Sequence, residues 1–237
     1  MQKTGDKLFV GYNGQFPSMP LFESLAMDNP TTLEGAQYFT NIMWPAGNHN
    51  FCETMYSYGK QVVELSKMAT KMVFESYGVE RVYETQMAMT DYVLRFFNYR
   101  RREANQSEVG LGPHTDSTFI SILHQSQFDG LQIKTKDGLW IDFKSSSPSS
   151  FLVFAGDILM AWSNERAHAC EHQVIIKQDK ERYSIGFFAL INGLIEVPEE
   201  LVDEKHPLQY KGIDNFGYLL FRGQKLSGIP IKAFCGV

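Results

Sequence analysis

Apolar residues recur at intervals of three and four between Phe51 and Gly78, which is the spacing of one face of an α-helix. Gly78 follows the series as a candidate C-cap. The pattern therefore predicts one long helix over residues 51–78. The residues of the apolar face are Met55, Tyr58, Val62, Leu65, Met68, Met72 and Val73.

After about residue 91 the pattern changes to short runs of β-branched and aromatic residues separated by turn signals. Short strands at this spacing predict an antiparallel sandwich or barrel with the helix packed outside it. Lys136-Asp137-Gly138 predicts a tight hairpin turn. The predicted strands cover residues 92–99, 118–123, 131–134, 140–143, 151–154, 174–176 and 183–190.

Three other parts of the chain lack a sustained period. Residues 1–50 are rich in Gly, Pro, Asn and Met and predict irregular coil packed on the rest. The apolar stretch 151–162 is interrupted by Gly156-Asp157, and we interpret it as buried strand. From Pro198 onward the pattern indicates a loop and a mixed tail.

Composition excludes several classes of protein. The 237 residues are 43% hydrophobic, and the net charge of −5 argues against a nucleic-acid partner, for which Arg100-Arg101-Arg102 is the only basic run. The apolar stretch 151–162 is shorter than the roughly 20 residues of a membrane helix. Three cysteines without CxxC spacing indicate a reducing, cytoplasmic protein, and Met1–Asp6 shows no secretory signal.

One histidine-containing motif carries candidate chemistry. Asp116 lies two residues after His114, so in an extended chain both side chains point to the same face. His172 opens a later predicted strand. Two histidines and one carboxylate leave three adjacent positions of an octahedral metal open, as in non-haem Fe(II) oxygenases. A zinc hydrolase uses the same ligand types, but no glutamate is evidently placed as its general base.

Arg182 and Ser184 share one face of another predicted strand. A guanidinium beside a hydroxyl is what an anchor for a carboxylate requires. An Fe(II) site together with a dicarboxylate anchor indicates 2-oxoglutarate, whereas a zinc hydrolase would leave Arg182 without a role.

A series of short motifs runs in order through residues 91–190. They are Pro113-His114-Thr115-Asp116, Gly130-Leu131-Gln132, Asp137-Gly138-Leu139-Trp140-Ile141, Ala155-Gly156-Asp157, Trp162-Ser163-Asn164, Cys170-Glu171-His172-Gln173-Val174 and Arg182-Tyr183-Ser184. In sequence and spacing this region resembles the plant Fe(II)/2-oxoglutarate-dependent dioxygenases. Outside it, Met43-Trp44-Pro45, Asn50-Phe51-Cys52, residues 197–203 and residues 232–237 resemble the subgroup that contains the glucosinolate side-chain dioxygenases, which make alkenyl and hydroxyalkyl products.

The resemblance implies a mainly β fold, a double-stranded β-helix (jelly-roll) core with flanking helices. It implies that His114, Asp116 and His172 ligate Fe(II), that Arg182 and Ser184 bind the distal carboxylate of 2-oxoglutarate, and that Tyr99 assists. O2 is then the second cosubstrate, and ascorbate the family's usual reductant. The expected division is a partial N-terminal region 1–90, the dioxygenase core 91–191 and a C-terminal extension 192–237 packed on the core.

Two departures from the family pattern are visible. Phe97 stands where the family usually has an asparagine near the cosubstrate. Family members also carry further strands and a helix before the position of Gly11-Tyr12, so we expect an exposed sheet edge or a weakened core.

The expected activity is hydroxylation or desaturation of a small plant specialised metabolite, such as a glucosinolate side chain. The same chemistry on a hormone or phenolic compound, and a truncated homologue that binds metal without turnover, remain alternatives. We expect a monomer in the cytoplasm with no nucleic-acid or membrane partner.

Some side chains allow two interpretations. His168 lies four residues before His172 and is expected to face solvent. Methionines 19, 27 and 43 could face a substrate, but core filling is the favoured interpretation. Candidate pocket walls by strand placement are Phe97, Phe188 and Phe216.

Overall fold

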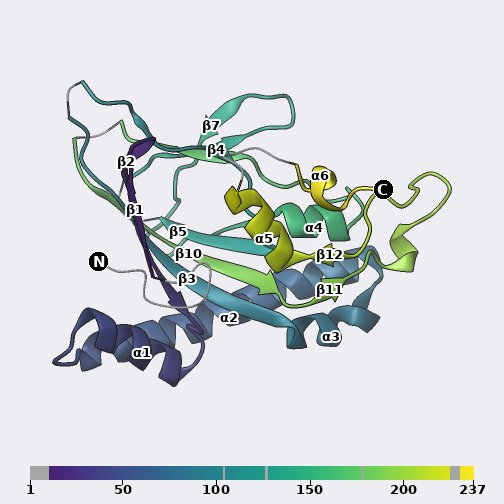
Figure 1. Ribbon diagram of the computed structural model, residues 1–237, viewed down its shortest axis with the longest axis horizontal. Helices are drawn as coiled ribbons and strands as arrows, with labels where there is room; N and C mark the ends of the chain where they lie inside the picture. The colour runs from purple at the N-terminus through teal and green to yellow at the C-terminus, as the bar shows by residue number, and fades with distance from the viewer. Residues whose placement is uncertain (1–10, 104, 126–127, 178, 225–229) are drawn as a thin grey trace.

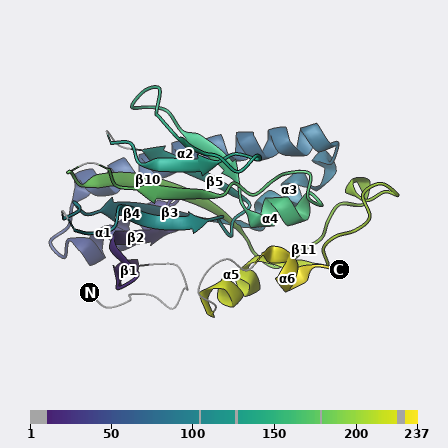
Figure 2. The same ribbon diagram turned by 90° about the horizontal axis from the view of Figure 1, so that it is seen from above.

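Two antiparallel sheets face each other, and the longest helix lies along the outer side of the larger sheet (Figures 1 and 2). This computed structural model describes residues 11–237 except 104, 126–127, 178 and 225–229. Met1–Asp6 and the rest of the first ten residues lie outside the described residues. The two-sheet arrangement with flanking helices agrees with the predicted double-stranded β-helix.

The larger sheet has six strands in the order β1-β2-β3-β10-β5-β8, with antiparallel pairing throughout. Its strands are β1 (Gly11–Phe16), β2 (Met19–Asp28), β3 (Thr90–Tyr99), β10 (Arg182–Ile191), β5 (Ile120–Gln125) and β8 (Leu152–Ala155). β1 and β8 form its two edges, and β3 and β10 are its long central pair.

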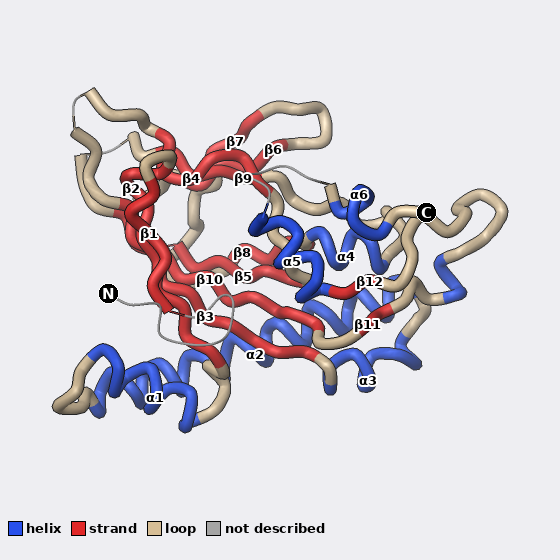
Figure 3. Tube along the Cα trace, in the orientation of Figure 1, coloured by secondary structure: helices blue, strands red, loops and turns tan. Residues whose placement is uncertain are grey.

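The smaller sheet has four strands in the order β4-β9-β6-β7. They are β4 (Val109–His114), β9 (His172–Ile175), β6 (Leu131–Lys134) and β7 (Trp140–Asp142). The predicted hairpin turn connects β6 to β7, where Gly138 takes a positive φ of 87°. Figure 3 shows this sheet above the larger one. β4 was not predicted because its glycines and proline hide the strand pattern.

The long helix α2 (His49–Tyr77) confirms the prediction for residues 51–78. The side chain of Asn48 accepts a hydrogen bond from the Phe51 amide, and Gly78 ends the helix with a left-handed φ of 69°. Its buried face packs into the main core cluster, which includes Val62, Phe74 and residues of the larger sheet. The other helices are α1 (Leu33–Met43), η1 (Glu80–Val82), α3 (Tyr83–Ala88), α4 (Asp157–Trp162), η2 (Glu199–Leu201), α5 (Asn215–Gln224) and α6 (Ile231–Cys235), and a last strand pair joins β11 (Leu194–Ile195) to β12 (Ile213–Asp214).

The prediction of irregular coil for residues 1–50 is wrong for its described part, which forms β1, β2 and α1. β2 lies inside the sheet, paired with both β1 and β3. Both faces of this strand are covered, so Ala26 and Met27 are both buried and the sequence shows no clean alternation. Core filling is confirmed for the three methionines, because Met27 is a core residue and Met19 and Met43 pack against the core clusters.

The strand interpretation of residues 151–162 is wrong in its second half, where α4 begins at Asp157. A short apolar run has the same composition in a buried strand and in a buried helix. Gly156 marks the change, because a Cβ there would lie 2.1 Å from the carbonyl oxygen of Thr118. In the described tail after Pro198, the short helix η2 and the strand β12 precede the helices α5 and α6.

Alternate residues of the central strands face opposite sides of the larger sheet. On β10, Phe187 and Ile191 pack in the core cluster with α2. Arg182, Ser184 and Phe188 line the cavity on the other side. The period of two thus brings the polar side chains of β10 into the space between the sheets.

Gly59 lies in the middle of α2 and lets the helix approach the chain at Pro30 closely, since a Cβ would lie 2.1 Å from the Pro30 carbonyl oxygen. Because the clash is with backbone, we expect Gly59→Ala to lower the free energy of unfolding by about 1–3 kcal/mol. Thermal unfolding measures this as a lower Tm. The control is Gly223→Ala on α5, where a Cβ meets nothing within 4 Å. A Gly59→Ala variant as stable as the parent would contradict the assigned contact.

Candidate active site

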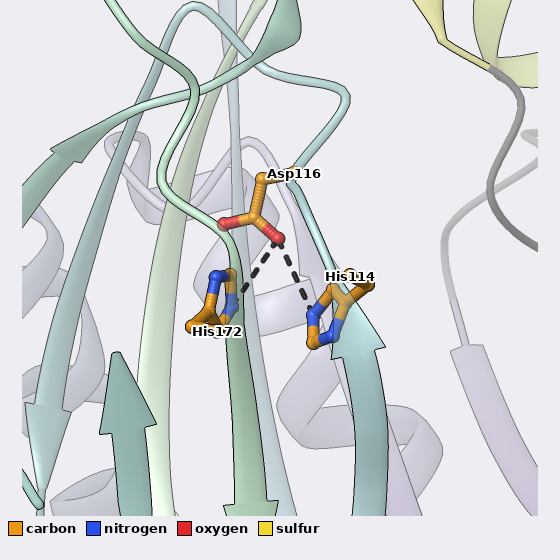
Figure 4. Close-up of side chains that lie close together, drawn as sticks. All are labelled: His114, Asp116 and His172. Atoms are coloured by element: carbon orange, nitrogen blue, oxygen red, sulfur yellow. Dashed lines mark ion pairs between the residues drawn. The ribbon is translucent and has the colours of Figure 1, made fainter. Parts of the chain in front are cut away.

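His114, Asp116 and His172 lie together between the two sheets (Figure 4). His114 is the last residue of β4 and pairs with His172, the first residue of β9. The distance from Asp116 Oδ1 to His114 Nε2 is 3.7 Å and to His172 Nε2 is 3.8 Å. One ligand atom from each residue lies within 4.8 Å of the others, so the three side chains can converge on one metal ion.

Backbone hydrogen bonds orient both imidazole rings. His114 Nδ1 lies 2.8 Å from the Gly112 carbonyl oxygen, and His172 Nδ1 lies 2.9 Å from the Cys170 carbonyl oxygen. A carbonyl can only accept, so each Nδ1 carries the proton and each Nε2 offers a lone pair toward Asp116. Asp116 Oδ2 is buried and has no hydrogen-bond partner among the described residues. This donor set fits a divalent cation.

Burial and the neighbouring His172 lower the pKa of His114 to about 4 from an ordinary value of 6.5. The imidazole is therefore neutral at pH 7, as a metal ligand must be. Because the pKa of His114 is lower in the folded protein, the free energy of unfolding is expected to depend on pH.

As the pH falls below about 6.5, the unfolded chain takes up the His114 proton before the folded chain does. We therefore expect the metal-free protein to lose stability between about pH 6.5 and about pH 4, with the full contribution of His114 present above that range. Urea unfolding at a series of pH values measures this loss. His114→Gln should reduce the loss, whereas His168→Gln, which removes an exposed histidine, should retain it. Equal slopes for His114→Gln and the parent would contradict the burial effect.

Arg182 lies on β10 and is 3% exposed. Its Nη1 donates to Ser184 Oγ at 3.2 Å and its Nη2 donates to Gln125 Oε1 at 2.8 Å. Its Nε is buried without a hydrogen-bond partner in the described part of the chain. Burial lowers the pKa of Arg182, so an incoming carboxylate would restore the charge compensation that this guanidinium lacks.

Tyr99 pairs with Arg182 across β3 and β10. Its ring lies 5.2 Å from the guanidinium carbon, which is within cation–π range. Tyr99 is 2% exposed, and burial raises its pKa to about 12. The tyrosine is thus a neutral side chain that packs on the predicted anchor.

One cavity of about 290 Å³ contains the three predicted metal ligands, Arg182, Ser184 and Tyr99. This volume is at the lower end of the range for small-molecule sites. Phe97 and Phe188 line it as predicted, but Phe216 does not and packs instead against the small cluster of Ala26, Val93 and Leu190. Other apolar lining residues are Phe22, Val93, Leu111, Leu123, Leu131, Val174, Leu190 and Leu219.

Several residues of the site were not found from the sequence. Gln125 accepts from Arg182, and the Phe154 ring lies 4.8 Å from the His172 ring, tilted by 41°. Arg95 lines the cavity from β3 and donates to Ser24 Oγ at 2.9 Å. Alternation along β3 would also have indicated Arg95, whereas Gln125 depends on the pairing of β5 with β10 and Phe154 on how β8 meets β9. His168 is exposed, as predicted.

Comparison with known proteins agrees with this geometry. The 2OG-Fe(II) oxygenase superfamily matches residues 88–190. A probable 2-oxoglutarate-dependent dioxygenase, AOP1 of Arabidopsis thaliana, is 38% identical over 93% of this chain and 74% of its own length. The chain belongs to the 2-oxoglutarate- and Fe(II)-dependent dioxygenase family. A second relative, AOP1.2 of the same plant, is 39% identical, and the chain spans 65% of its length.

Solved structures share the dioxygenase fold. The Arabidopsis thaliana dioxygenase for auxin oxidation 1 in complex with 2-oxoglutarate superposes with a TM-score of 0.79 at 25% identity, over 86% of this chain and 77% of that one. JOX2 in complex with 2-oxoglutarate, iron and JA superposes with a TM-score of 0.79 at 25% identity, over 95% of this chain and 68% of that one. These structures confirm the jelly-roll fold, and Fe(II) and 2-oxoglutarate are the family's cofactor and cosubstrate.

Within the described ranges, no helix is long and apolar enough to cross a membrane.

Proposed function

We propose that this chain catalyses the Fe(II)- and 2-oxoglutarate-dependent oxidation of a small organic molecule. One observation carries the proposal: the three metal-ligand side chains and the buried Arg182–Ser184 pair line the same cavity. Each set has a buried polar atom that lacks a partner among the described residues, Asp116 Oδ2 and Arg182 Nε. A divalent cation and a dicarboxylate would satisfy both.

The side chains of the site have two binding roles. His114, Asp116 and His172 would hold the iron, while Arg182 and Ser184 would bind the distal carboxylate of 2-oxoglutarate. Bound iron, 2-oxoglutarate and O2 would together supply the oxidising power to break a C–H bond, while 2-oxoglutarate becomes succinate and CO2. Tyr99 packs on the anchor, and the apolar walls exclude water and orient the substrate.

The proposed substrate is a small specialised metabolite, with a glucosinolate side chain as the first candidate. The motifs around residues 43–52, 197–203 and 232–237 support this choice. A hormone or a phenolic compound is the alternative. The hormone is supported by two related structures, a dioxygenase for auxin oxidation and JOX2 in complex with JA. The proposed setting is a cytoplasmic monomer.

The first test is an anaerobic titration of the full chain with Fe(II) and 2-oxoglutarate, with Arg182→Ala as the control. We expect the visible charge-transfer band of the chelated cosubstrate, weaker in the control. A folded chain without a band would overturn the proposal and favour a non-catalytic homologue, a state for which one relative, named a probable inactive AOP2 at 26% identity, is a precedent.

The second test identifies the substrate class. Glucosinolates, hormones and phenolic compounds are each incubated with the iron-loaded enzyme and 2-oxoglutarate, and succinate release is compared with the uncoupled background. Stimulation by hormones or phenolics alone would contradict the glucosinolate assignment while retaining the dioxygenase.

A further inference from the structure

One face of helix α5 is bonded to the loop that carries Asp116. Asn215, Tyr218 and Arg222 follow each other at positions i, i+3 and i+7, which places them on one side of the helix. In the view of Figure 1, α5 lies in front of the sheets. Figure 2, seen from above, shows α5 below the sheets, near α6 and β11. The three side chains reach residues 115–117 and the start of α4.

Asn215 and Tyr218 make the first two contacts. Asn215 Nδ2 donates to the Ser117 carbonyl oxygen at 2.8 Å, and Asn215 Oδ1 accepts from the Ile191 amide at 3.0 Å. The Tyr218 hydroxyl donates to Asp157 Oδ2 at 2.7 Å. Asn215 and Tyr218 are both 0% exposed, so these bonds are made away from water.

Arg222 makes the central contact. Its Nη1 lies 3.0 Å from the Thr115 carbonyl oxygen, 2.8 Å from Ser117 Oγ and 2.8 Å from Asp157 Oδ2. Thr115 stands directly between His114 and Asp116. The side chain of Asp157 is 5% exposed and that of Arg222 is 19% exposed, so this is a mostly buried ion pair.

Asp157 holds the same loop from its other side. Its backbone amide donates to the Asp116 carbonyl oxygen at 2.8 Å, and the next amide, of Ile158, donates to the Thr118 carbonyl oxygen at 3.1 Å. Burial raises the pKa of Asp157, while Tyr218 and Arg222 favour its charged form. A buried ion pair is weak evidence for a gain in stability, but here both members bond to residues next to a metal-ligand carboxylate.

We propose that Arg222 is a positioning residue of the metal site: it holds Thr115 and Ser117 so that Asp116 faces both histidine Nε2 atoms. The inference rests on the proposed function, since it requires a cation at His114, Asp116 and His172. Leu219 and Arg222 also line the cavity, so α5 joins the loop to the space available for a substrate.

The test is an anaerobic titration of the full chain with Co(II), followed by the visible absorption of the bound ion, at a temperature well below the Tm of each variant. We expect Arg222→Met to raise the Kd for Co(II) by about 10- to 100-fold and to change the absorption spectrum, as loss of a residue that orients metal ligands does. Tyr218→Phe, which removes only one hydroxyl, should have a smaller effect in the same direction. Arg222→Lys should recover part of the affinity.

The matched control is Arg81→Met, which removes an exposed arginine that pairs with Glu200 and does not line the cavity. It should bind Co(II) like the parent. A purely structural role of Arg222 would lower the Tm and leave the Kd and spectrum of the folded protein unchanged, and that result would overturn the inference.

Two further outcomes keep the inference and the proposed function separate. If Arg222→Met does not fold, the Co(II) affinities of Tyr218→Phe and Arg222→Lys test the inference instead. If both variants bind Co(II) as tightly as the parent, the inference is overturned. If the parent binds Co(II) no better than Asp116→Ala does, the metal site itself is wrong.

Discussion

Replacing Asp116 by alanine is expected to abolish 2-oxoglutarate turnover. Asp116 Oδ1 lies within 3.8 Å of both histidine Nε2 atoms and is the only carboxylate in the cluster. Loss of a residue that merely orients a ligand lowers metal affinity or activity by about 10- to 100-fold. Loss of a charged ligand itself should therefore cost more than about 100-fold in turnover. Succinate release from the iron-loaded protein measures the effect, with or without a known substrate.

The folded state should survive this change. Asp116 Oδ2 is buried and makes no hydrogen bond to the described residues, so alanine removes a carboxylate that the metal-free protein does not satisfy. We expect the Tm of metal-free Asp116→Ala to be no lower than that of the parent. The control is Asp179→Ala, whose carboxylate is 77% exposed and pairs with Arg101 on the surface. Undiminished succinate release by Asp116→Ala would show that the metal site lies elsewhere.

Replacing Arg182 by alanine is expected to raise the KM for 2-oxoglutarate with a smaller change in kcat. Hydrogen bonds to charged groups contribute about 1.5–3 kcal/mol each, which corresponds to about 10- to 150-fold in affinity for one lost bond. Arg182 is 3% exposed, so water cannot replace the guanidinium effectively. Steady-state succinate release at varied 2-oxoglutarate concentration separates KM from kcat.

Two variants make the Arg182 result specific. Arg182→Lys keeps the positive charge but lacks the planar guanidinium that can donate two parallel hydrogen bonds, so it should recover only part of the affinity for 2-oxoglutarate. Arg101→Ala removes an arginine whose side chain is 66% exposed, and it should behave like the parent. An unchanged KM in Arg182→Ala would mean that the cosubstrate uses another cation of the cavity, such as Arg95.

The sequence predicted those parts of the site that depend on local spacing. His114 and Asp116 are two residues apart, as are Arg182 and Ser184, and a strand places such pairs on one face. The three-and-four spacing of 51–78 likewise predicted α2, because a helix with one covered face needs that period. The order and spacing of the motifs added the family and its jelly-roll fold.

Where both faces of an element are covered, the amino-acid pattern was not enough. β2 shows no clean alternation because both of its faces are covered, with Ala26 and Met27 buried in different clusters. The sequence of α4 does not distinguish a helix from a strand because a short buried run carries no period.

Contacts between distant parts of the chain were decided only by the tertiary structure. Gln125 meets Arg182 because β5 pairs with β10, and Arg222 meets Thr115 because α5 packs beside the loop after β4. Each of these side chains is unremarkable in its own segment. Local spacing in the sequence predicts which residues bind a metal and a dicarboxylate. The packing of sheets and helices shows which other residues contact them, since a hydrogen bond between distant segments depends on where the whole fold brings them.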